Sequence, residues 1–210
     1  MLVRNLKDRF LAVPWVYDKL RPLVAGGIDF QSIANFCDCD GHDKVFDFGC
    51  GTGQLLPFLR FSEYVGVDLD AAAVRRAARL SAANVRFLEG EEWDDVYCRL
   101  NPTVVLLIGV VHHLSDDDFR SALERFLLPG MLPRFVTVDV SYFPGQPLNN
   151  FLSRMDRGRH VRTQQAYERL YRKSGLHVTR SQTISTRLHY VQYAGYHLRA
   201  DSGSRRAPAF

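Results

Sequence analysis

The stretch VFDFGCGTG, residues 45–53, decides the fold of this 210-residue chain. A short apolar run here meets three glycines at alternate positions, Gly49, Gly51 and Gly53. Glycine has no Cβ and tolerates positive φ angles, so a strand that ends in such a turn lets the backbone approach a ligand closely. If a helix follows the turn, its first N–H groups favour negative charge at the same place. The stretch therefore indicates a cofactor that contains a nucleotide.

The length and composition of the chain predict one soluble globular domain. Of the 210 residues, 46% are hydrophobic and 24% are charged, which is ordinary for a globular protein. A domain of this length buries roughly 70% of its unfolded surface and needs neither a disulfide nor a metal ion to fold. The net charge of +4 includes Arg205 and Arg206 in a polar tail. It does not by itself indicate a nucleic-acid partner.

Signals for secretion, membrane insertion and metal binding are missing from the sequence. The first residues, MLVRNLKDRF, lack the apolar core of a secretory signal, and no run approaches the ~18 apolar residues of a membrane span. We therefore expect a cytoplasmic protein with reduced cysteines and no membrane contact. Cys37, Cys39 and His42 do not follow a structural zinc spacing. We predict a polar turn there and no metal site.

Alternating strand and helix patterns from residue 44 onward predict an α/β fold. The run TVVLLIG at 103–109 is typical of a central strand buried on both faces. We expect a doubly wound, mostly parallel sheet with helices on both faces, which binds ligands at the carboxyl ends of its strands. The expected strands are 45–48, 64–68, 85–88, 103–109, 135–140, 176–183 and 190–198, and the expected helices among them are 54–61, 70–81, 96–100, 115–126 and 163–174.

The chain is predicted to form a single domain over residues 1–200, followed by a flexible tail at 201–210. The longest stretch without clear periodicity is 142–162, and such a stretch in a compact domain is often functional. The domain divides into an N-terminal helical cap at 1–42, a cofactor-binding core at 43–142, and a substrate-side insert with the C-terminal strands at 143–200.

The glycine spacing argues against a dinucleotide cofactor. In the fingerprint G-x-G-x-x-G the third glycine would come one residue later than Gly53. An acidic residue, Asp47, precedes the glycines, and Asp68 ends the next strand. The stretches VFDFGCGTG, VGVDLD, VRFLEGEEW and VVLLIGVVHHL follow in this order. Over about residues 43–142 they resemble the motifs of the class I S-adenosylmethionine-dependent methyltransferases.

The resemblance implies a fold, a cofactor and a set of contacts. It implies a seven-stranded sheet with an antiparallel last strand, S-adenosylmethionine as cofactor and S-adenosylhomocysteine as product. Asp47 would anchor the methionine amino group, and Leu69 would pack on the adenine. Asp68 would accept both ribose hydroxyls, since a carboxylate suits a vicinal diol. The implied cofactor-binding residues are Tyr17, Asp47, Gly49, Cys50, Gly51, Gly53, Asp68, Leu69, Glu91, Glu92, Trp93, Gly109 and Val110.

Several of these residues also have a purely structural interpretation. Asp68 is alternatively a plain helix cap at a strand-to-helix turn. Glu91 would accept from the adenine amino group, yet the family usually carries aspartate there, and Glu91 with Glu92 is alternatively a solvated face. Trp93 is as well suited to the core as to shielding adenine, and Tyr17 either contacts the cofactor or packs in the core.

Three histidines, His112, His113 and His160, and three arginines are the candidate acceptor-side residues. Methyl transfer is an in-line displacement, so the protein positions the acceptor and, where needed, takes its proton. His113 follows the central strand, and His160 lies in the segment DRGRHVR at 156–162; both are predicted catalytic residues. Arg157, Arg159 and Arg162 are predicted to bind a carboxylate or phosphate of the acceptor. The alternatives are a solvated basic loop and, for His113, a role in shaping its own loop.

The acceptor class follows from motifs that the chain lacks. Enzymes that methylate amino groups of bases carry Asn/Asp-Pro-Pro-aromatic after the fourth strand, where residues 109–112 read GVVH. Asp139, with Asn149 and Asn150, is not a convincing ligand set for the metal-dependent catechol type. We expect no separate recognition domain, and we therefore predict a small-molecule O- or N-methyltransferase, of the kind found in specialised metabolism.

Other functions stay open at this point. They are an RNA methyltransferase, a regulatory module that binds S-adenosylmethionine without catalysis, and a nicotinamide oxidoreductase, which the glycine spacing disfavours. The expected partner is a small-molecule acceptor rather than nucleic acid. The expected assembly is a monomer or a homodimer.

Overall fold

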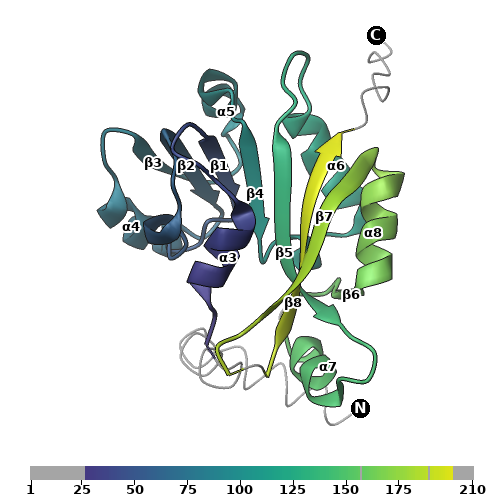
Figure 1. Cartoon of the computed structure of the whole chain (residues 1–210). Coiled ribbons are helices and arrows are strands. Elements are labelled where there is room, and N and C mark those ends of the chain that lie inside the picture. The colour runs from purple at the N-terminus through teal and green to yellow at the C-terminus, as the bar shows by residue number, and fades with distance from the viewer. Residues whose placement is uncertain (1–26, 157, 189, 201–210) are drawn as a thin grey trace.

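A mixed sheet forms the centre of the computed structural model, which describes residues 27–156, 158–188 and 190–200 (Figure 1). Within these residues the strands run in the order β3-β2-β1-β4-β5-β8-β7, with β6 beside β5. Strands β1 to β5 are parallel, β8 is antiparallel to β5, and β7 is antiparallel to β8. Their bounds are β1 Lys44–Phe48, β2 Glu63–Asp68, β3 Val85–Glu89, β4 Val104–Ile108, β5 Arg134–Tyr142, β6 Arg162–Thr163, β7 Leu176–Ser185 and β8 Gln192–Ala200.

This topology confirms the predicted doubly wound, mostly parallel sheet with an antiparallel last strand. The chain winds outward from β1 to β3, then returns to the other side of β1 with β4 and β5. The switch point therefore lies between β1 and β4, where such sheets bind their ligands. The two-residue strand β6 was not predicted from any sequence pattern. It lies at the C-terminal end of the stretch 142–162.

Helices cover both faces of the sheet, and each face has its own apolar core (Figure 1). On β4, Val105 and Leu107 face one core while Val104 and Leu106 face the other, as expected for a strand buried on both sides. The first core is covered by α5 (Asp94–Leu100), α6 (Asp116–Phe126) and α8 (Gln164–Lys173), and the second by α3 (Phe30–Cys37) with the short helix η1 (Leu56–Phe58).

Polar side chains define where helices begin. Asp29 accepts from the N–H of Ser32 at 3.1 Å and starts α3. Asp70 starts α4 (Ala71–Ala77), and Ser115 starts α6 with a reciprocal capping box to Asp118. These caps satisfy N–H groups that have no partner inside the helix, and all three are legible in the sequence.

The helix predicted for residues 54–61 is wrong. The chain there makes only the three-residue turn η1, and Leu59 is already extended, with φ −88° and ψ 153°. Pro57 has no N–H to donate, so it does not support a longer helical ladder. One turn also carries too few aligned peptides for a useful dipole. The glycine loop therefore faces its ligand without the helix N-terminus that the sequence suggested.

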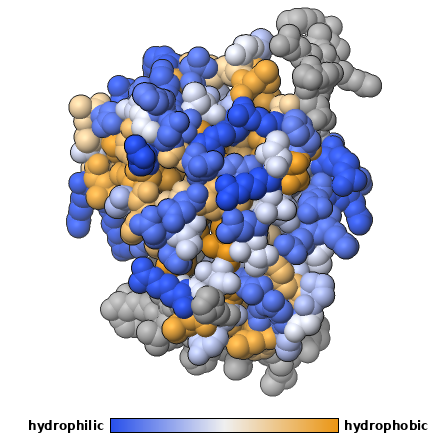
Figure 2. Space-filling view, in the orientation of Figure 1, coloured by the Kyte–Doolittle hydropathy of each residue, from blue (hydrophilic) through white to orange (hydrophobic). Residues whose placement is uncertain are grey.

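The stretch 142–162 contains a helix that the sequence patterns missed, α7 (Pro147–Arg154). Asn149 ties α7 to the sheet: its Nδ2 donates to the carbonyl of Ser141 at 2.9 Å, and its Oδ1 accepts from the N–H of Gln192 at 2.8 Å. Leu148 and Phe151 stay largely exposed. Figure 2 shows hydrophobic residues at the surface in the lower part of the view, where Figure 1 places α7.

Some expectations fall on parts of the chain that the structure does not describe. The predicted cap at 1–42 is described only from residue 27, and Tyr17, Arg157 and the tail 201–210 lie outside the described residues. In the part that is described, no helix combines the length and the apolar character needed to cross a bilayer.

Candidate functional site

The glycine loop after β1 adopts a backbone conformation that favours glycine. Gly49, Gly51 and Gly53 have φ angles of +79°, +55° and +74°. A Cβ on Gly49 would lie 2.5 Å from Cγ2 of Val110, whereas a Cβ on Gly51 would meet no atom within 4 Å. Gly49 therefore lets the loops after β1 and β4 touch, and Gly51 leaves its backbone open.

Asp68, at the end of β2, is held against this loop. Its Oδ2 accepts from the N–H of Gly51 at 2.7 Å, and its Oδ1 accepts from the N–H of Asp70 at 2.9 Å. Asp70 is the cap of α4, with its Oδ1 2.8 Å from the N of Ala72, so plain capping is not the role of Asp68. Each carboxylate oxygen keeps a further lone pair for a ligand hydroxyl. The neighbouring Leu69 is 70% exposed.

Asp47 is a buried carboxyl group in β1, two residues before Gly49. Its Oδ2 accepts from the hydroxyl of Tyr64 at 2.6 Å. Burial raises the pKa of Asp47 to about 6; the hydrogen bond from Tyr64 opposes this rise, and repulsion from Asp68 adds to it. An ammonium group placed beside this carboxyl would favour its charged form.

Cys50 fills space inside the glycine loop. A Cβ on Gly66 would lie 2.9 Å from the Cys50 sulfur, so β2 needs glycine where the thiol packs. Burial raises the pKa of the Cys50 thiol. The thiolate is the nucleophilic form, and a raised pKa disfavours it.

The third motif places its residues differently from the prediction. Glu91 and Glu92 are exposed, and the carbonyl of Glu91 accepts from Nη2 of Arg125 at 2.6 Å. Trp93 is only 2% exposed and lies in the core, stacked on Phe126 with ring centroids 5.2 Å apart. The Arg125 guanidinium lies 3.9 Å from the centroid of the Trp93 ring. The structure therefore corrects the adenine-shielding role of Trp93, because its side chain is committed to packing.

The loop after β4 lies against the glycine loop. The chain leaves β4 through Gly109, which has φ +73° and donates its N–H to the carbonyl of Val138 at 2.8 Å. Val110 follows and lies next to Gly49, and the short helix η3 (Val111–His113) continues the chain. The structure thus brings Gly49, Gly109 and Val110 to one end of the sheet, beside the switch point.

A buried histidine lies between two carboxylates at the same end of the sheet. Nδ1 of His112 is 2.7 Å from Oδ1 of Asp139, and the backbone N–H of His112 donates to that oxygen at 3.1 Å. Nε2 of His112 is 3.1 Å from Oδ1 of Asp156. The two atoms are close enough for an ion pair, but their geometry does not meet the criteria for a hydrogen bond. Oδ1 of Asp156 also accepts from the N–H of Gly158 at 2.9 Å.

The two carboxylates keep His112 protonated. Burial lowers the pKa of His112, but the hydrogen bond with Asp139 and the negative charges of Asp139 and Asp156 outweigh burial and raise this pKa to about 9. At neutral pH both ring nitrogens are therefore donors. A buried, protonated imidazole does not take a proton from an acceptor, so His112 is not the general base.

Arg162 is a structural residue and not the acceptor ligand that the sequence suggested. Its Nη1 donates to the carbonyls of Val111 at 3.1 Å and His160 at 2.9 Å. Its Nη2 donates to the carbonyl of Leu114 at 2.9 Å and to Oδ1 of Asp116 at 2.7 Å. Both terminal nitrogens of the guanidinium are therefore engaged within the protein.

The remaining acceptor-side predictions lie near η3. His113 is exposed, and the centroid of its ring is 4.1 Å from that of His112. His160 is half-buried and donates its backbone N–H to the carbonyl of His112 at 2.9 Å. Arg159 is exposed. The structure thus brings His113 and the backbone of His160 together at the carboxyl end of β4.

Asp156 and its pairing with His112 escaped sequence reasoning. The two residues belong to different loops, and Asp139 comes from a third element, β5. The signals that the sequence offered were the aspartate that opens DRGRHVR and the histidine pair after β4. The ligand atoms of His112, His113 and Asp156 lie within 4.8 Å of one another, a spacing that a metal ion also accepts.

Comparison with known proteins identifies the architecture. A family model described as "Methyltransferase domain" matches residues 46–127. A search of curated protein sequences returns no match. Among solved structures, the chain is similar to the mitomycin 7-O-methyltransferase MmcR, with a TM-score of 0.62 and 20% identity over 82% of this chain and 53% of that one. The chain therefore spans about half the length of MmcR.

Two further solved structures share the architecture. CalO1, a methyltransferase in calicheamicin biosynthesis solved in its S-adenosylhomocysteine-bound form, gives a TM-score of 0.65 and 21% identity over 93% of this chain and 61% of that one. An S-adenosylmethionine-dependent methyltransferase from Aquifex aeolicus gives 0.61 and 17% identity over 90% of this chain and 98% of that one. At these identities the likeness shows the fold.

Proposed function

Since the chain belongs to the class I S-adenosylmethionine-dependent methyltransferases, we propose that it methylates an oxygen or nitrogen atom of a small molecule. Its cofactor is S-adenosylmethionine, and the cofactor product is S-adenosylhomocysteine. The solved structures that it resembles include a mitomycin 7-O-methyltransferase and a methyltransferase of calicheamicin biosynthesis. The substrates of these two enzymes support a small-molecule acceptor for this chain without identifying it.

The observation that carries the proposal is the meeting of three loops at the carboxyl ends of β1, β2 and β4. The open backbone at Gly51 lies beside the fixed carboxylate of Asp68, and Val110 touches Gly49. We assign the ribose hydroxyls to Asp68, the methionine ammonium group to the buried Asp47, and the adenine to the exposed Leu69. These assignments pair the ammonium group with a carboxyl group of opposite charge, the hydroxyl groups with a hydrogen-bond acceptor, and the adenine with an apolar side chain.

The acceptor side is assigned to η3 and to the segment 156–162. In-line transfer needs the acceptor atom held against the methyl group, and an oxygen or nitrogen acceptor often gives up a proton. His113 is exposed on η3, directly after the loop that contacts Gly49. We assign proton removal to His113, with His160 as the second candidate. A short segment in this place suits a small acceptor better than a folded macromolecule.

The cofactor assignment is tested by Asp68→Ala. Each hydrogen bond to a carboxylate contributes about 1.5–3 kcal/mol, so the loss of two should weaken S-adenosylhomocysteine binding by roughly a hundredfold or more. Isothermal calorimetry measures the affinity, and circular dichroism checks that the variant is folded. Asp70→Asn is the matched control, because asparagine caps α4 as well as aspartate does. Equal affinity in Asp68→Ala and wild type would reject the ribose role.

The acceptor class is tested with a pooled library of small hydroxyl and amine compounds. We expect S-adenosylhomocysteine to form from S-adenosylmethionine with at least one member, and mass spectrometry identifies the methylated product. A parallel arm uses total RNA at low and moderate salt, because RNA binding through phosphates weakens steeply with salt. Methylated RNA and an inactive library would replace the small-molecule proposal with RNA methylation.

A further inference from the structure

The described residues of the segment 156–162, which are 156 and 158–162, meet the loop after β4 at His112. Asp156 lies 3.1 Å from Nε2 of His112, and the N–H of His160 donates to the carbonyl of His112 at 2.9 Å. Gly158 packs directly on the ring: a Cβ there would lie 2.0 Å from Cδ2 of His112 and 2.7 Å from its carbonyl oxygen. The segment therefore contacts the ring, the carbonyl and the charge of one residue.

We propose that His112 is a positioning residue, whose imidazolium couples Asp139 to Asp156 and so holds the segment 156–162 beside the methyl-transfer position. The inference rests on the function proposed above and extends it to the acceptor side. His160 and Arg159 belong to the held segment, so His112 determines where they meet the acceptor without touching the acceptor itself.

The two carboxylates belong to different parts of the fold, a central strand and a loop. Asp139 is 1% exposed and lies in β5, which pairs with β4 on one side and β8 on the other. It accepts from both the ring and the backbone N–H of His112. Asp156 comes just after α7, at the start of the segment. The imidazolium thus links a strand of the core to a loop at its edge.

The charges that face His112 favour the protonated ring. They are the carboxylates of Asp139 from β5 and Asp156 after α7. The ring of His113 on η3 also lies beside His112 and adds no favourable charge. The hydroxyl of Tyr167 on α8 lies near Asp139 but donates to the carbonyl of Val140 at 3.0 Å. A neutral ring would have one N–H for two buried carboxylates. It would also carry no positive charge, and a buried carboxylate without a compensating charge is costly, so the proton is part of the link.

The first test is the protonation state of His112 in the full chain. Nitrogen-15 NMR of the imidazole distinguishes a ring with two N–H groups from either neutral tautomer. We expect two N–H groups near pH 7.5 and loss of one only at about pH 9, well above the ordinary histidine range. A neutral His112 near pH 7.5 would overturn the proposal.

The second test removes the charge of Asp156 and keeps its shape. Asp156→Asn retains an oxygen for the N–H of Gly158 but cannot hold the imidazolium. We expect amide hydrogen exchange across residues 156–162 to quicken by about tenfold or more, because local opening becomes easier. Asp117→Asn makes the same change at an exposed carboxylate on α6, and it should leave exchange in the segment as in wild type. Unchanged exchange in Asp156→Asn contradicts the proposal.

Binding and kinetics separate this inference from the proposed function. We expect Asp156→Asn to bind S-adenosylhomocysteine with the affinity of the wild-type protein. If the wild-type protein itself does not bind S-adenosylhomocysteine, the proposed methyltransferase function is wrong, whatever the role of His112. With the acceptor found in the library, the variant should show a KM raised about tenfold with a much smaller change in kcat. A fall in kcat with KM unchanged would oppose a positioning role.

A metal ion is the alternative occupant of this cluster. Under the proposal, EDTA leaves the exchange of residues 156–162 unchanged and added Zn²⁺ does not slow it. If EDTA speeds up the exchange of these residues and added Zn²⁺ reverses the effect, then His112, His113 and Asp156 bind a metal ion and the proposal is wrong.

Discussion

Two carboxylates near the glycine loop, Asp47 and Asp68, have different surroundings that suit them to different partners. Asp47 is buried and accepts from one phenol, whereas Asp68 is half-buried and accepts from two backbone N–H groups. A buried carboxyl group gains most from a cation that arrives with the ligand. A fixed carboxylate at the surface is suited to hydroxyl groups.

The buried carboxyl group predicts a conflict between stability and binding. The pKa of Asp47 in the folded chain is about 6, above the ordinary 3.8, so its contribution favours folding most below about pH 4 and is lost as the pH rises through 6. Asp47→Asn removes the charge at every pH. The ligand-free variant should unfold roughly 5 °C above wild type near pH 7.5 and at the same temperature near pH 4, while binding S-adenosylhomocysteine about tenfold more weakly.

Thermal unfolding at the two pH values, followed by calorimetry with S-adenosylhomocysteine, checks both halves of this prediction. Equal unfolding temperatures near pH 7.5 would show that ionised Asp47 carries no burial cost. Wild-type affinity in the variant would remove Asp47 from the ammonium site.

Close packing at Gly158 gives a second prediction for a single residue. Alanine there would bring Cβ to 2.0 Å from Cδ2 of His112, so the segment must move away. We expect Gly158→Ala to lower the free energy of unfolding by about 1–3 kcal/mol, measured by urea denaturation. Gly41→Ala is the control, because a Cβ at Gly41 meets no atom within 4 Å. Equal effects of the two substitutions would contradict the tight contact.

Helices in this chain follow local signals where a cap is present. Asp29, Asp70 and Ser115 mark the starts of α3, α4 and α6, and all three are of residue types that favour the cap position. The missed helix α7 has no capping side chain at its start, Gln146. The polar residue Asn149 instead holds it to β5 and β8, and a contact of that kind depends on the folded sheet.

The capping box of α6 predicts the effect of Ser115→Ala. The hydroxyl of Ser115 accepts from the N–H of Asp118 at 3.1 Å, and this bond ends with the substitution. We expect the free energy of unfolding to fall by about 0.5–2 kcal/mol, measured by urea denaturation. Ser121→Ala lies on the same helix at an exposed position and should cause no loss, since alanine is the better helix former. A loss at both sites would argue against the cap.

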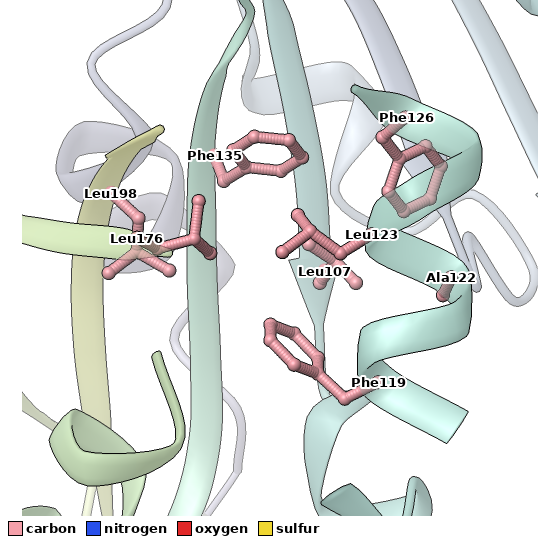
Figure 3. A pocket seen from close by; sticks show the side chains of 8 residues that line it. All are labelled: Leu107, Phe119, Ala122, Leu123, Phe126, Phe135, Leu176 and Leu198. Carbon is pink, nitrogen blue, oxygen red and sulfur yellow. The ribbon is translucent and has the colours of Figure 1, made fainter. Parts of the chain in front are cut away.

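At the scale of the whole molecule, the sheet separates two cores that stabilise it from opposite sides. Figure 3 shows side chains of α6 pointing toward Leu107 of β4 and Phe135 of β5, with Leu176 and Leu198 nearby. The apolar gap that these residues line leaves no room for a water molecule. The packing that joins α6 to the sheet is therefore dry and close.

This packing predicts a large cost for Leu123→Ala. Leu123 is 5% exposed and lies between α6 and the sheet. Removal of its branched end leaves a cavity in a close-packed core, so the free energy of unfolding should fall by about 2–5 kcal/mol. Leu132→Ala changes the same side chain where it is 58% exposed and should cost far less. Chemical denaturation of both variants checks the difference, and similar losses would contradict the assigned burial.

The sequence by itself predicted an S-adenosylmethionine cofactor and the seven main strands in their order along the chain. Both depend on local patterns: glycines at alternate positions after a strand, an acidic residue at the end of the next strand, and runs of apolar residues at strand spacing. Such patterns act over a few neighbouring residues, and their physical causes are local, namely positive φ angles and alternating burial. Pro57, which has no N–H to donate, prevents the helix expected at 54–61, and this effect is equally local.

Only the tertiary structure showed which residues surround His112, on the side that we assign to the acceptor. The linked residues come from three different parts of the chain: His112, Asp139 and Asp156. His112 and Asp139 are 27 residues apart in the sequence. Their ionic link forms because the carboxyl end of β4 lies beside β5 and α7 returns the chain to the same edge. The same folding moved Trp93 into the core and engaged Arg162 with backbone carbonyls. Contacts between distant residues depend on topology, which no short stretch of sequence contains.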